Sequence, residues 1–300
     1  MLGDTAIAVN PKDDRFKDIV GKSVTIPLAN RKIKIITDDY ADPEQGTGAV
    51  KITPAHDFND YDVGIRNKLE VINIFTPDGK INDNAPDPYK GLDRFAARKL
   101  ILEHLEEGKF LEKIEKLVNK VPYGDRSNSI IEPYLTEQWF VDAKTLAIKA
   151  KEVVNNGKTK FFPENWSKTY FQWMDNIEPW CISRQLWWGH QIPAWYGPDG
   201  KIFVAENEDE CKKQAKEFYS KDVELKRDDD VLDTWFSSGL WPFATLGWPE
   251  KTPEVEKFYP TSVLVTGFDI IFFWVARMIM MGTEFLKEEP FKNIYVHALV

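Results

Sequence analysis

The sequence predicts an α/β protein with two domains, a strand-rich mixed domain followed by part of a doubly wound parallel sheet. At 300 residues, the chain is longer than one typical compact core requires. Short segments of its first half alternate between apolar and polar residues, as half-buried strands do. In the second half, two almost continuous apolar strands at 261–267 and 293–300 flank an apolar helix at 270–285. This order is typical of a parallel sheet that is covered on both faces.

The first half contains three predicted strands and one helix. The strands are expected at 23–28, 32–36 and 70–75, and a Pro-Asp-Gly turn closes the third. The helix is expected to begin after Asp93, a suitable N-cap residue, and to end at Gly108.

The second half is predicted to be more helical. The spacing of apolar residues predicts helices at 142–155 and 166–174. Residues 196–230 are predicted to form an insertion, in which a Gly-Pro-Asp-Gly hairpin precedes a charged helix at 208–218. We therefore expect one domain over 1–145 and a second over 146–300.

Composition excludes several classes of protein. A formal net charge of −9 gives no global basic field to attract nucleic acid, although a local patch stays open. Cys181 and Cys211 form no CxxC pair, which indicates a reducing, cytoplasmic compartment and argues against a disulfide framework or a structural zinc site. We see no signal peptide, and the most apolar run, 270–281, contains Arg277 and is too short to span a bilayer. No membrane partner is expected.

The segment 46–64 gathers polar residues on a short stretch of chain, which are Lys51, Thr53, His56, Asp57 and Asp60. Such a cluster suggests a pocket for a small polar ligand. The alternative is a solvated strand–helix junction with Asp57 as N-cap and Asp60 in the first turn, and the residues alone favour it. No second His or Cys lies at ligand spacing from His56, so we expect no metal site.

Two motifs of the second half carry aromatic residues. In 178–196, five aromatic side chains interleave with Arg184, Gln185 and His190, which suits either a base-stacking platform or a dense aromatic core. In 230–243, Asp233 begins either a binding loop or a capped turn.

A third position of interest lies at the end of the predicted strand 261–267. Gly267 and Asp269 stand there, where ligands of doubly wound sheets bind. Asp269 can cap the next helix or hold a ribose hydroxyl or an amine, and we favour capping on the residues alone.

Together these motifs resemble the valyl-tRNA synthetases, within the class Ia aminoacyl-tRNA synthetase family, along nearly the whole chain. Residues 1–11 and 46–64 resemble editing-domain motifs. Residues 183–193, 230–243 and 266–282 resemble motifs of the catalytic half. The resemblance implies that 1–145 form an editing domain of the CP1 type without its N-terminal edge, and that the second domain is the second half of a Rossmann-like catalytic domain.

The resemblance also implies two activities of a parent enzyme. With ATP and Mg²⁺, the parent attaches valine to tRNA(Val) through a valyl-adenylate, and it hydrolyses mischarged threonyl-tRNA. The second activity has a physical reason, because a pocket sized for valine rejects isosteric threonine only ~100-fold. The expected parent is a monomeric cytoplasmic enzyme.

Residue roles follow from the same resemblance. In the editing domain, Asp60 would hold the amino group or hydroxyl of the misplaced aminoacyl group. Lys51 and Thr53 would line the pocket and contact the terminal adenosine, and Asp57 would support them.

In the catalytic half, Trp180 and Trp274 would flank the valine side chain, and Gly267 and Asp269 would contact the adenylate or its ribose. The family's HIGH and KMSKS signatures have no match in this sequence. We therefore expect an internal fragment that does not activate valine alone. The alternatives are a freestanding aminoacyl-tRNA deacylase and a non-catalytic tRNA-binding module derived from a synthetase.

Overall fold

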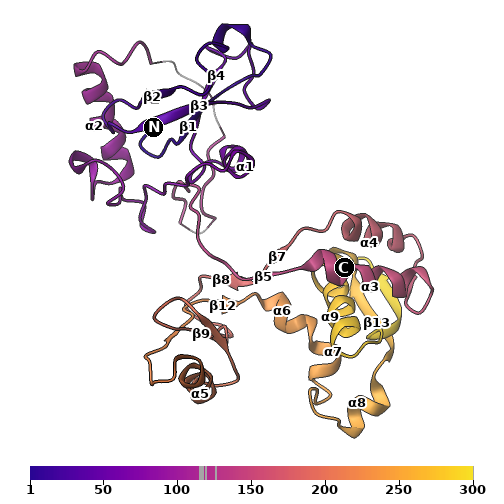
Figure 1. Ribbon diagram of the computed structural model, residues 1–300. Helices are drawn as coiled ribbons and strands as arrows, with labels where there is room; N and C mark the ends of the chain where they lie inside the picture. The colour runs from indigo at the N-terminus through magenta and orange to yellow at the C-terminus, as the bar shows by residue number, and fades with distance from the viewer. Residues whose placement is uncertain (115–117, 119, 126, 300) are drawn as a thin grey trace. The chain divides into compact units, whose positions relative to one another are not determined.

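The computed structural model describes residues 1–114, 118, 120–125 and 127–299. It divides the chain into two units, Met1–Thr136 and Glu137–Val300 (Figure 1). The division falls before the expected boundary at 145, which would cut through helix α3 (Ala143–Asn155) of the second unit.

The first unit contains a four-stranded sheet of order β2-β3-β1-β4. Strand β1 is parallel to β3 and antiparallel to β4, and β2 is antiparallel to β3. Two of the three predicted strands are confirmed, the first in shortened form. The strands are β1 (Ala6–Val9), β2 (Ser23–Thr25), β3 (Lys32–Thr37) and β4 (Ala49–Ile52).

Helix α1 (Phe58–Asn67) follows β4 and packs on this sheet through Val63. The Asp57 side chain caps its start, and Lys68 ends it in the left-handed conformation. Gly64 faces Pro54, where an added Cβ would stand 2.8 Å from the proline ring, so the close approach of helix and loop requires glycine.

Helix α2 (Arg94–Glu107) confirms the predicted helix and its Asp93 cap. Gly108 ends it with an ordinary right-handed φ of −74°. Two short 3₁₀ turns, Asp14–Phe16 and Asp87–Tyr89, complete the regular structure of this unit.

The predicted strand at 70–75 is wrong, since the structure has there a single bridge between Phe75 and Ile81. Two side chains and a loop amide take the place of a strand partner, since the Asn82 amide donates to the Ile74 carbonyl over 2.9 Å. The Ile74 amide donates to His56 Nε2 over 3.0 Å, and Asn82 Nδ2 donates to the Asn73 carbonyl over 2.9 Å. Because these bonds satisfy the backbone, an apolar alternation without a neighbouring strand does not become a sheet.

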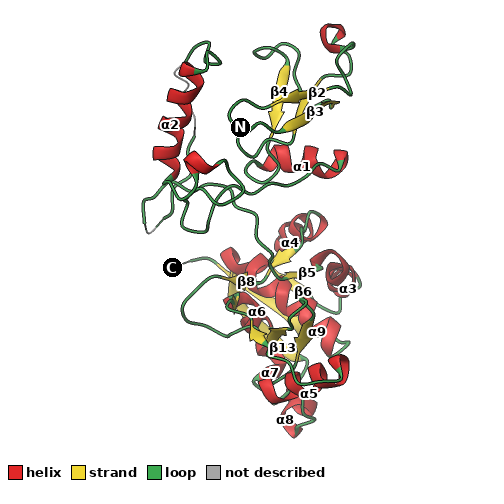
Figure 2. Ribbon diagram, turned by 60° about the vertical axis from the view of Figure 1, so that its left-hand side comes forward, coloured by secondary structure: helices red, strands yellow, loops and turns green. Residues whose placement is uncertain are grey.

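The second unit is built on a parallel sheet of order β13-β14-β6, which confirms the predicted parallel pairing. Figure 2 shows its helices in red around the yellow strands. The strands are β6 (Lys160–Phe162), β13 (Thr261–Gly267) and β14 (Phe291–His297). The helices of the same cluster are α3, α4 (Trp166–Asp175), α7 (Trp241–Ala244) and α9 (Arg277–Phe285).

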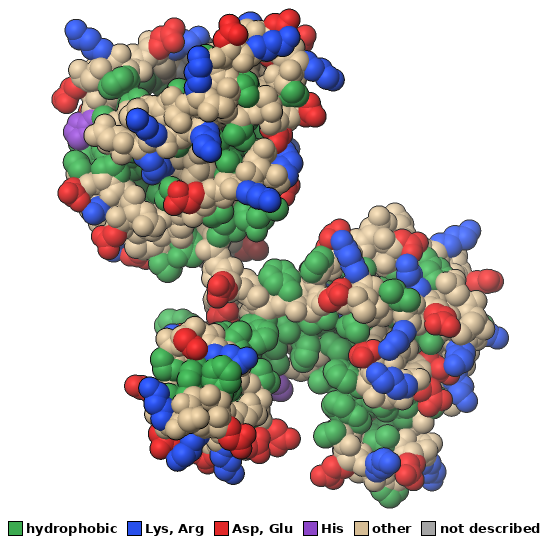
Figure 3. Space-filling model, in the orientation of Figure 1, with side chains coloured by type: hydrophobic (Ala, Val, Ile, Leu, Met, Phe, Trp, Pro, Cys, Tyr) green, Lys and Arg blue, Asp and Glu red, His purple; other side chains and the backbone are tan. Residues whose placement is uncertain are grey.

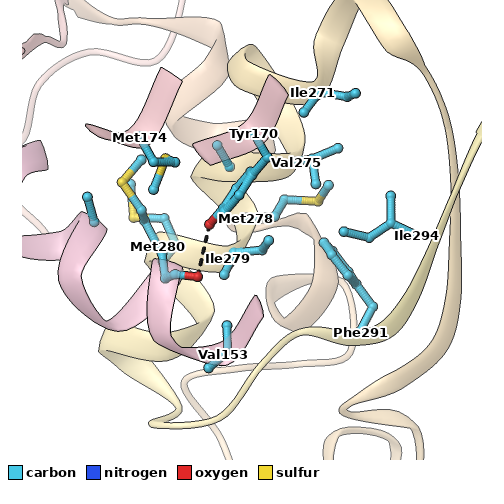
Figure 4. Packing of buried hydrophobic residues seen from close by; sticks show 14 of the residues in the cluster. Val153, Tyr170, Met174, Ile271, Val275, Met278, Ile279, Met280, Phe291 and Ile294 are labelled. Atoms are coloured by element: carbon cyan, nitrogen blue, oxygen red, sulfur yellow. Dashed lines mark hydrogen bonds between the residues drawn. The ribbon is translucent and has the colours of Figure 1, made fainter. Parts of the chain in front are cut away.

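The core of this unit lies between that sheet and its helices (Figure 4). Tyr170 of α4 is buried and donates its hydroxyl to the carbonyl oxygen of Ala150 in α3 over 2.9 Å. Met278 and Ile279 of α9 pack in the same cluster as Ile294 of β14. The predicted helix 270–285 is only partly regular, because a 3₁₀ turn (Phe268–Ile270) and a π-helical segment (Ile271–Ala276) precede α9.

The expectation that these strands are buried on both faces is wrong for this chain. Leu264, Ile294 and Phe161 are buried on one face. On the other, Val265, Tyr295 and Phe162 pair in register and are 60%, 55% and 47% exposed. Apolar residues on both faces therefore do not by themselves show that both faces are covered in this chain.

The predicted hairpin within the insertion is confirmed. A small sheet of order β10-β9-β11 packs with α5 (Glu208–Tyr219) around Trp195 and Phe203. Two strand pairs lie beside it, β5 with β7 and β8 with β12. The strands are β5 (Phe140–Val141), β7 (Trp180–Cys181), β8 (Ser183–Arg184), β9 (Ala194–Tyr196), β10 (Ile202–Val204), β11 (Lys226–Arg227) and β12 (Val231–Leu232). Two further helices are α6 (Thr234–Gly239) and α8 (Pro253–Phe258).

An ion pair between a buried carboxylate and a half-exposed guanidinium fixes α1 to the sheet of the first unit. Asp38, next to β3, accepts two hydrogen bonds from the Arg66 guanidinium over 2.9 and 2.8 Å and one from Asn67 over 2.8 Å. Hydrogen bonding to Arg66 outweighs burial and lowers the pKa of Asp38 to about 2.

We expect Asp38→Asn to lower the stability of the first unit by about 2 kcal/mol at neutral pH. In the unsubstituted chain, the stability of the first unit should fall as the pH drops from 3.8, the unshifted carboxyl pKa, toward 2. The reason is that Asp38 is protonated in the unfolded chain before it is protonated in the folded one. The variant should lack this step. All 11 tryptophans lie in the second unit. The urea-unfolding transition monitored by circular dichroism should therefore shift, whereas the transition monitored by tryptophan fluorescence should not. Equal circular-dichroism transitions in the two chains would contradict the prediction.

Candidate functional site

The polar residues of the segment 46–64 form a connected cluster in the first unit. Lys51 of β4 donates from Nζ to Asp60 Oδ2 over 2.7 Å, and the Thr53 amide donates to the same oxygen over 2.8 Å. Thr53 Oγ1 donates to Asp4 Oδ1 over 2.6 Å. The structure thus brings together three of the four predicted editing residues and adds Asp4, which the sequence patterns did not single out.

Asp57 has a different place. Its Oδ1 accepts from the amides of Asn59 and Asp60 over 2.9 and 3.1 Å, so it is the N-cap of α1. The capped junction that the residues alone favour is therefore correct for Asp57. By fixing the first turn of α1, this cap also fixes Asp60.

The cluster reaches from the interior to the surface. Asp60 is 1% exposed, whereas the Lys51 side chain is 54% exposed. Burial disfavours the Lys51 ammonium, but Asp60, helped by Asp4 and Asp57, outweighs this effect, so the pKa of Lys51 lies above its usual value. Lys51 therefore stays charged and can offer N–H groups to a ligand oxygen.

His56 fastens three segments together, a role that sequence patterns did not indicate. Its Nε2 accepts from the Ile74 amide over 3.0 Å, so Nδ1 carries the proton and donates to the Pro133 carbonyl over 3.0 Å. Phe75 packs edge-on against the ring at 4.7 Å. Because Nε2 already accepts from a backbone amide, it is not available to bind a metal ion. Only the structure reveals this partner.

In the second unit, Asp233 joins three of the motif residues. Its Oδ2 accepts from Trp180 Nε1 over 2.9 Å and from Arg184 NH2 over 2.9 Å, and lies 3.5 Å from Arg277 NH1. The Arg277 guanidinium stands 3.8 Å from the centre of the Trp180 ring. Burial lowers the pKa of Arg277 to about 10; Asp233 opposes this shift and Arg184 adds to it.

Trp274 lies against α6, the short helix that Asp233 caps. Its Nε1 donates to the Ser238 carbonyl over 3.1 Å, and its ring is 6.2 Å from that of Trp241. Trp180 is 9% exposed and Trp274 is half-buried. The two tryptophans predicted to flank valine are thus both attached to α6 or its cap.

Gly267 and Asp269 lie at the carboxyl end of β13, as expected. A Cβ at Gly267 would stand 2.5 Å from Asp269 Oδ1, so the aspartate folds back over the glycine. No side-chain bond caps this helix start in the part of the chain that the structure describes, so the favoured capping interpretation of Asp269 is wrong. Its carboxylate is exposed and available to a ligand.

The surface of each unit carries both signs of charge. On the faces that Figure 3 shows, acidic and basic side chains are interspersed over each unit. Among the described residues, no group of three or more His, Cys, Asp or Glu side chains is placed to hold a metal ion. No helix in the described ranges is long and apolar enough to cross a membrane.

A family model described as "tRNA synthetases class I (I, L, M and V)" matches residues 7–300. The chain belongs to the class I tRNA synthetases. This synthetase chain is 77% identical over 300 residues to the valine–tRNA ligase of Pelagibacter ubique (strain HTCC1062), covering 100% of the chain and 34% of that protein. It is 61% identical to the valine–tRNA ligase of Caulobacter vibrioides (strain ATCC 19089 / CIP 103742 / CB 15), again over the whole chain and 33% of the relative.

These comparisons confirm the resemblance to valyl-tRNA synthetases that the motifs indicate. The synthetase chain spans about one third of the length of the curated relatives it matches. The residue roles in its two sites are not tested by the comparisons and stay predictions.

The stability of the first unit should depend on pH through His56. Burial lowers the pKa of His56 below 6.5, although the Pro133 carbonyl opposes the shift. The stability that neutral His56 gives the first unit should be complete above pH 6.5 and should decrease as the pH falls below it, because the unfolded chain is protonated first. His56→Gln should cost about 1–2 kcal/mol at pH 7.5 and should remove this pH dependence.

Urea unfolding at pH 7.5, 6.5 and 5.5, followed by circular dichroism, measures both effects. His190→Gln in the second unit is the control and should leave the pH dependence of the first unit unchanged. If the stability of the His56→Gln chain kept the full pH dependence of the unsubstituted chain, another group would be responsible for the titration.

Proposed function

We propose that this chain is the part of a valine–tRNA ligase that carries most of an editing site in its first unit and the second half of the synthetic site in its second unit. The observation that carries the proposal is the 77% identity to a valine–tRNA ligase over all 300 residues. The whole enzyme attaches valine to tRNA(Val) through an ATP-derived valyl-adenylate, with Mg²⁺ accompanying ATP, and hydrolyses threonyl-tRNA. We place it in the cytoplasm as a monomer.

The editing proposal has support in the charges of the first unit. An editing pocket must accept the threonine hydroxyl and the amino group and must disfavour a methyl group. Asp60 offers a buried carboxylate whose Oδ2 is fixed by Lys51 and Thr53. A fixed carboxylate binds an ammonium or hydroxyl donor well and an apolar methyl badly.

The remaining residues of this site have assisting roles. Lys51, charged and half-exposed, contacts the terminal adenosine together with Thr53, and Asp57 holds the start of α1 in place. Lys51 at the pocket surface also attracts the anionic acceptor end of tRNA.

The synthetic proposal rests on the second unit. Trp180 and Trp274 flank the valine side chain, which suits an apolar pocket with walls of rigid aromatic rings. Gly267 and Asp269 contact the adenylate or its ribose at the carboxyl end of a parallel strand. The Asp269 carboxylate lies over Gly267 and is exposed, so a ribose hydroxyl can reach it from solvent.

We expect Asp60→Ala to reduce hydrolysis of threonyl-tRNA(Val) by about a hundredfold, because a desolvated charge contact of this kind contributes roughly 2–5 kcal/mol. The assay measures deacylation by a protein that contains this segment and has the full length of the curated relatives. Asp62→Ala, on the same helix but exposed, is the matched control and should retain hydrolysis.

Because Asp60→Ala also releases Lys51, the milder Lys51→Met should be tested beside it and should weaken hydrolysis with the fold intact by circular dichroism. Unchanged hydrolysis in both variants would refute the editing role. Hydrolysis by the 300-residue chain alone would favour a freestanding deacylase, and binding of tRNA without hydrolysis would favour a binding module.

We expect no valine-dependent pyrophosphate exchange by the 300-residue chain alone. The sequence contains neither HIGH nor KMSKS, and the groups of those signatures supply the charge that stabilises the transition state at the ATP phosphates. Exchange above background by the purified chain would contradict this expectation, and a protein of the relatives' length serves as the positive control.

A further inference from the structure

The indole N–H groups of Trp180 and Trp274 are both held by one short stretch of chain, Asp233 and the helix α6 that follows it. Trp180 Nε1 donates to Asp233 Oδ2, and Trp274 Nε1 donates to the carbonyl oxygen of Ser238. The proposed walls of the valine pocket therefore depend on the same element. Residues of this motif were expected to form either a binding loop or a capped turn. Asp233 does cap α6, and its side chain makes further contacts beyond the cap.

Asp233 divides its two oxygens between two tasks. Oδ1 accepts from the Trp235 amide over 3.1 Å, which is the bond that caps α6. Oδ2 accepts from Trp180 and Arg184 and lies beside Arg277. An N-cap needs one oxygen, so the second set of contacts is not explained by capping.

Arg277 holds Trp180 from another direction. Its guanidinium covers one face of the ring at 3.8 Å from the ring centre, and the residue is 8% exposed. A buried guanidinium requires a carboxylate nearby, and Asp233, itself 6% exposed, supplies that charge. Asp233 thus holds the N–H edge of the ring directly and the cation on its face electrostatically.

Trp180 has little freedom left. Its ring also contacts Phe236 of α6 at 6.0 Å between ring centres, and the residue is 9% exposed. A ligand can meet only the narrow strip of the ring that remains accessible. The direction in which this strip faces is set by the contacts to Asp233 and Arg277.

We propose that Asp233 is a positioning residue that orients Trp180 and thereby sets the fit of the amino-acid pocket to a small branched aliphatic side chain. The proposal rests on the function proposed above, in which Trp180 flanks valine. Asp233 touches no ligand, and its effect passes through the indole of Trp180.

The contact is tested first by its spectroscopic signature in the 300-residue chain. In ¹H–¹⁵N spectra, Trp180→Phe assigns the indole resonance of Trp180. Asp233→Asn keeps the side-chain shape and an oxygen for the cap but removes the charge. We expect the Trp180 indole proton to move upfield and to exchange faster with solvent, because a charge-assisted hydrogen bond is lost.

Asp228→Asn is the matched control, since Asp228 Oδ2 accepts from the indole of Trp139 over 2.8 Å in the same unit. It should move the Trp139 resonance and leave that of Trp180 in place. An unchanged Trp180 resonance in Asp233→Asn would overturn the proposal.

The effect on valine binding is tested in a protein that contains this segment and has the full length of the curated relatives. Asp233→Asn should raise KM for valine by about tenfold, with kcat and KM for ATP nearly unchanged. Combination with Trp180→Phe, which lacks the N–H donor, should be no worse than Trp180→Phe alone. Additive effects would show that Asp233 does not act through the indole and would overturn the positioning role.

Trp180→Ala separates this inference from the function on which it rests. A raised KM for valine in Trp180→Ala with an unchanged KM in Asp233→Asn would refute the positioning role alone. An unchanged KM in Trp180→Ala, with the Trp180 resonance shifted in Asp233→Asn, would refute the proposed place of Trp180 in the valine pocket.

Discussion

A carboxylate that leaves water must be paired, and both units of this chain are organised around that constraint. Asp38, Asp60 and Asp233 are 9%, 1% and 6% exposed. Each would cost several kcal/mol if it were left alone, so each collects cations and N–H groups from distant segments. Asp38 fastens α1 to the sheet, Asp60 joins α1 to β4, and Asp233 joins α6 to β7 and α9. The carboxylates thereby determine which segments meet, and the side chains of the two proposed sites take their positions from them.

How far the sequence predicts the structure depends on whether a feature is local. The caps at Asp93 and Asp57 were predictable, because a cap needs only the amides that follow it within a turn. The strand expected at 70–75 failed because its partners are the His56 side chain and Asn82, which no periodicity in that segment reveals. Likewise, apolar strands predicted the parallel pairing of β13 with β14 but not the exposure of Val265 and Tyr295 on one face.

The candidate sites follow the same division. Motif resemblance indicated which residues to consider, including Lys51, Asp60 and Trp180. It did not indicate which atoms they contact, since the Trp180–Asp233 hydrogen bond joins positions 53 residues apart. The Asp57 cap was predictable from one turn of chain, whereas the link from Thr53 to Asp4 spans 49 residues. The motif resemblance therefore indicated the candidate residues, whereas the pairing of their side chains required the fold.

The break in the long apolar helix has a reason in the same set of contacts. The π-helical segment Ile271–Ala276 carries Trp274, and Arg277 is the first residue of the regular helix α9. Trp274 must reach the carbonyl of Ser238, while Arg277 must lie over Trp180 and beside Asp233. A wider turn changes the direction in which successive side chains leave the helix, and such turns occur frequently at functional sites. In this irregular helix, Trp274 and Arg277, three positions apart, contact the two ends of α6, which the apolar periodicity of the sequence does not reveal.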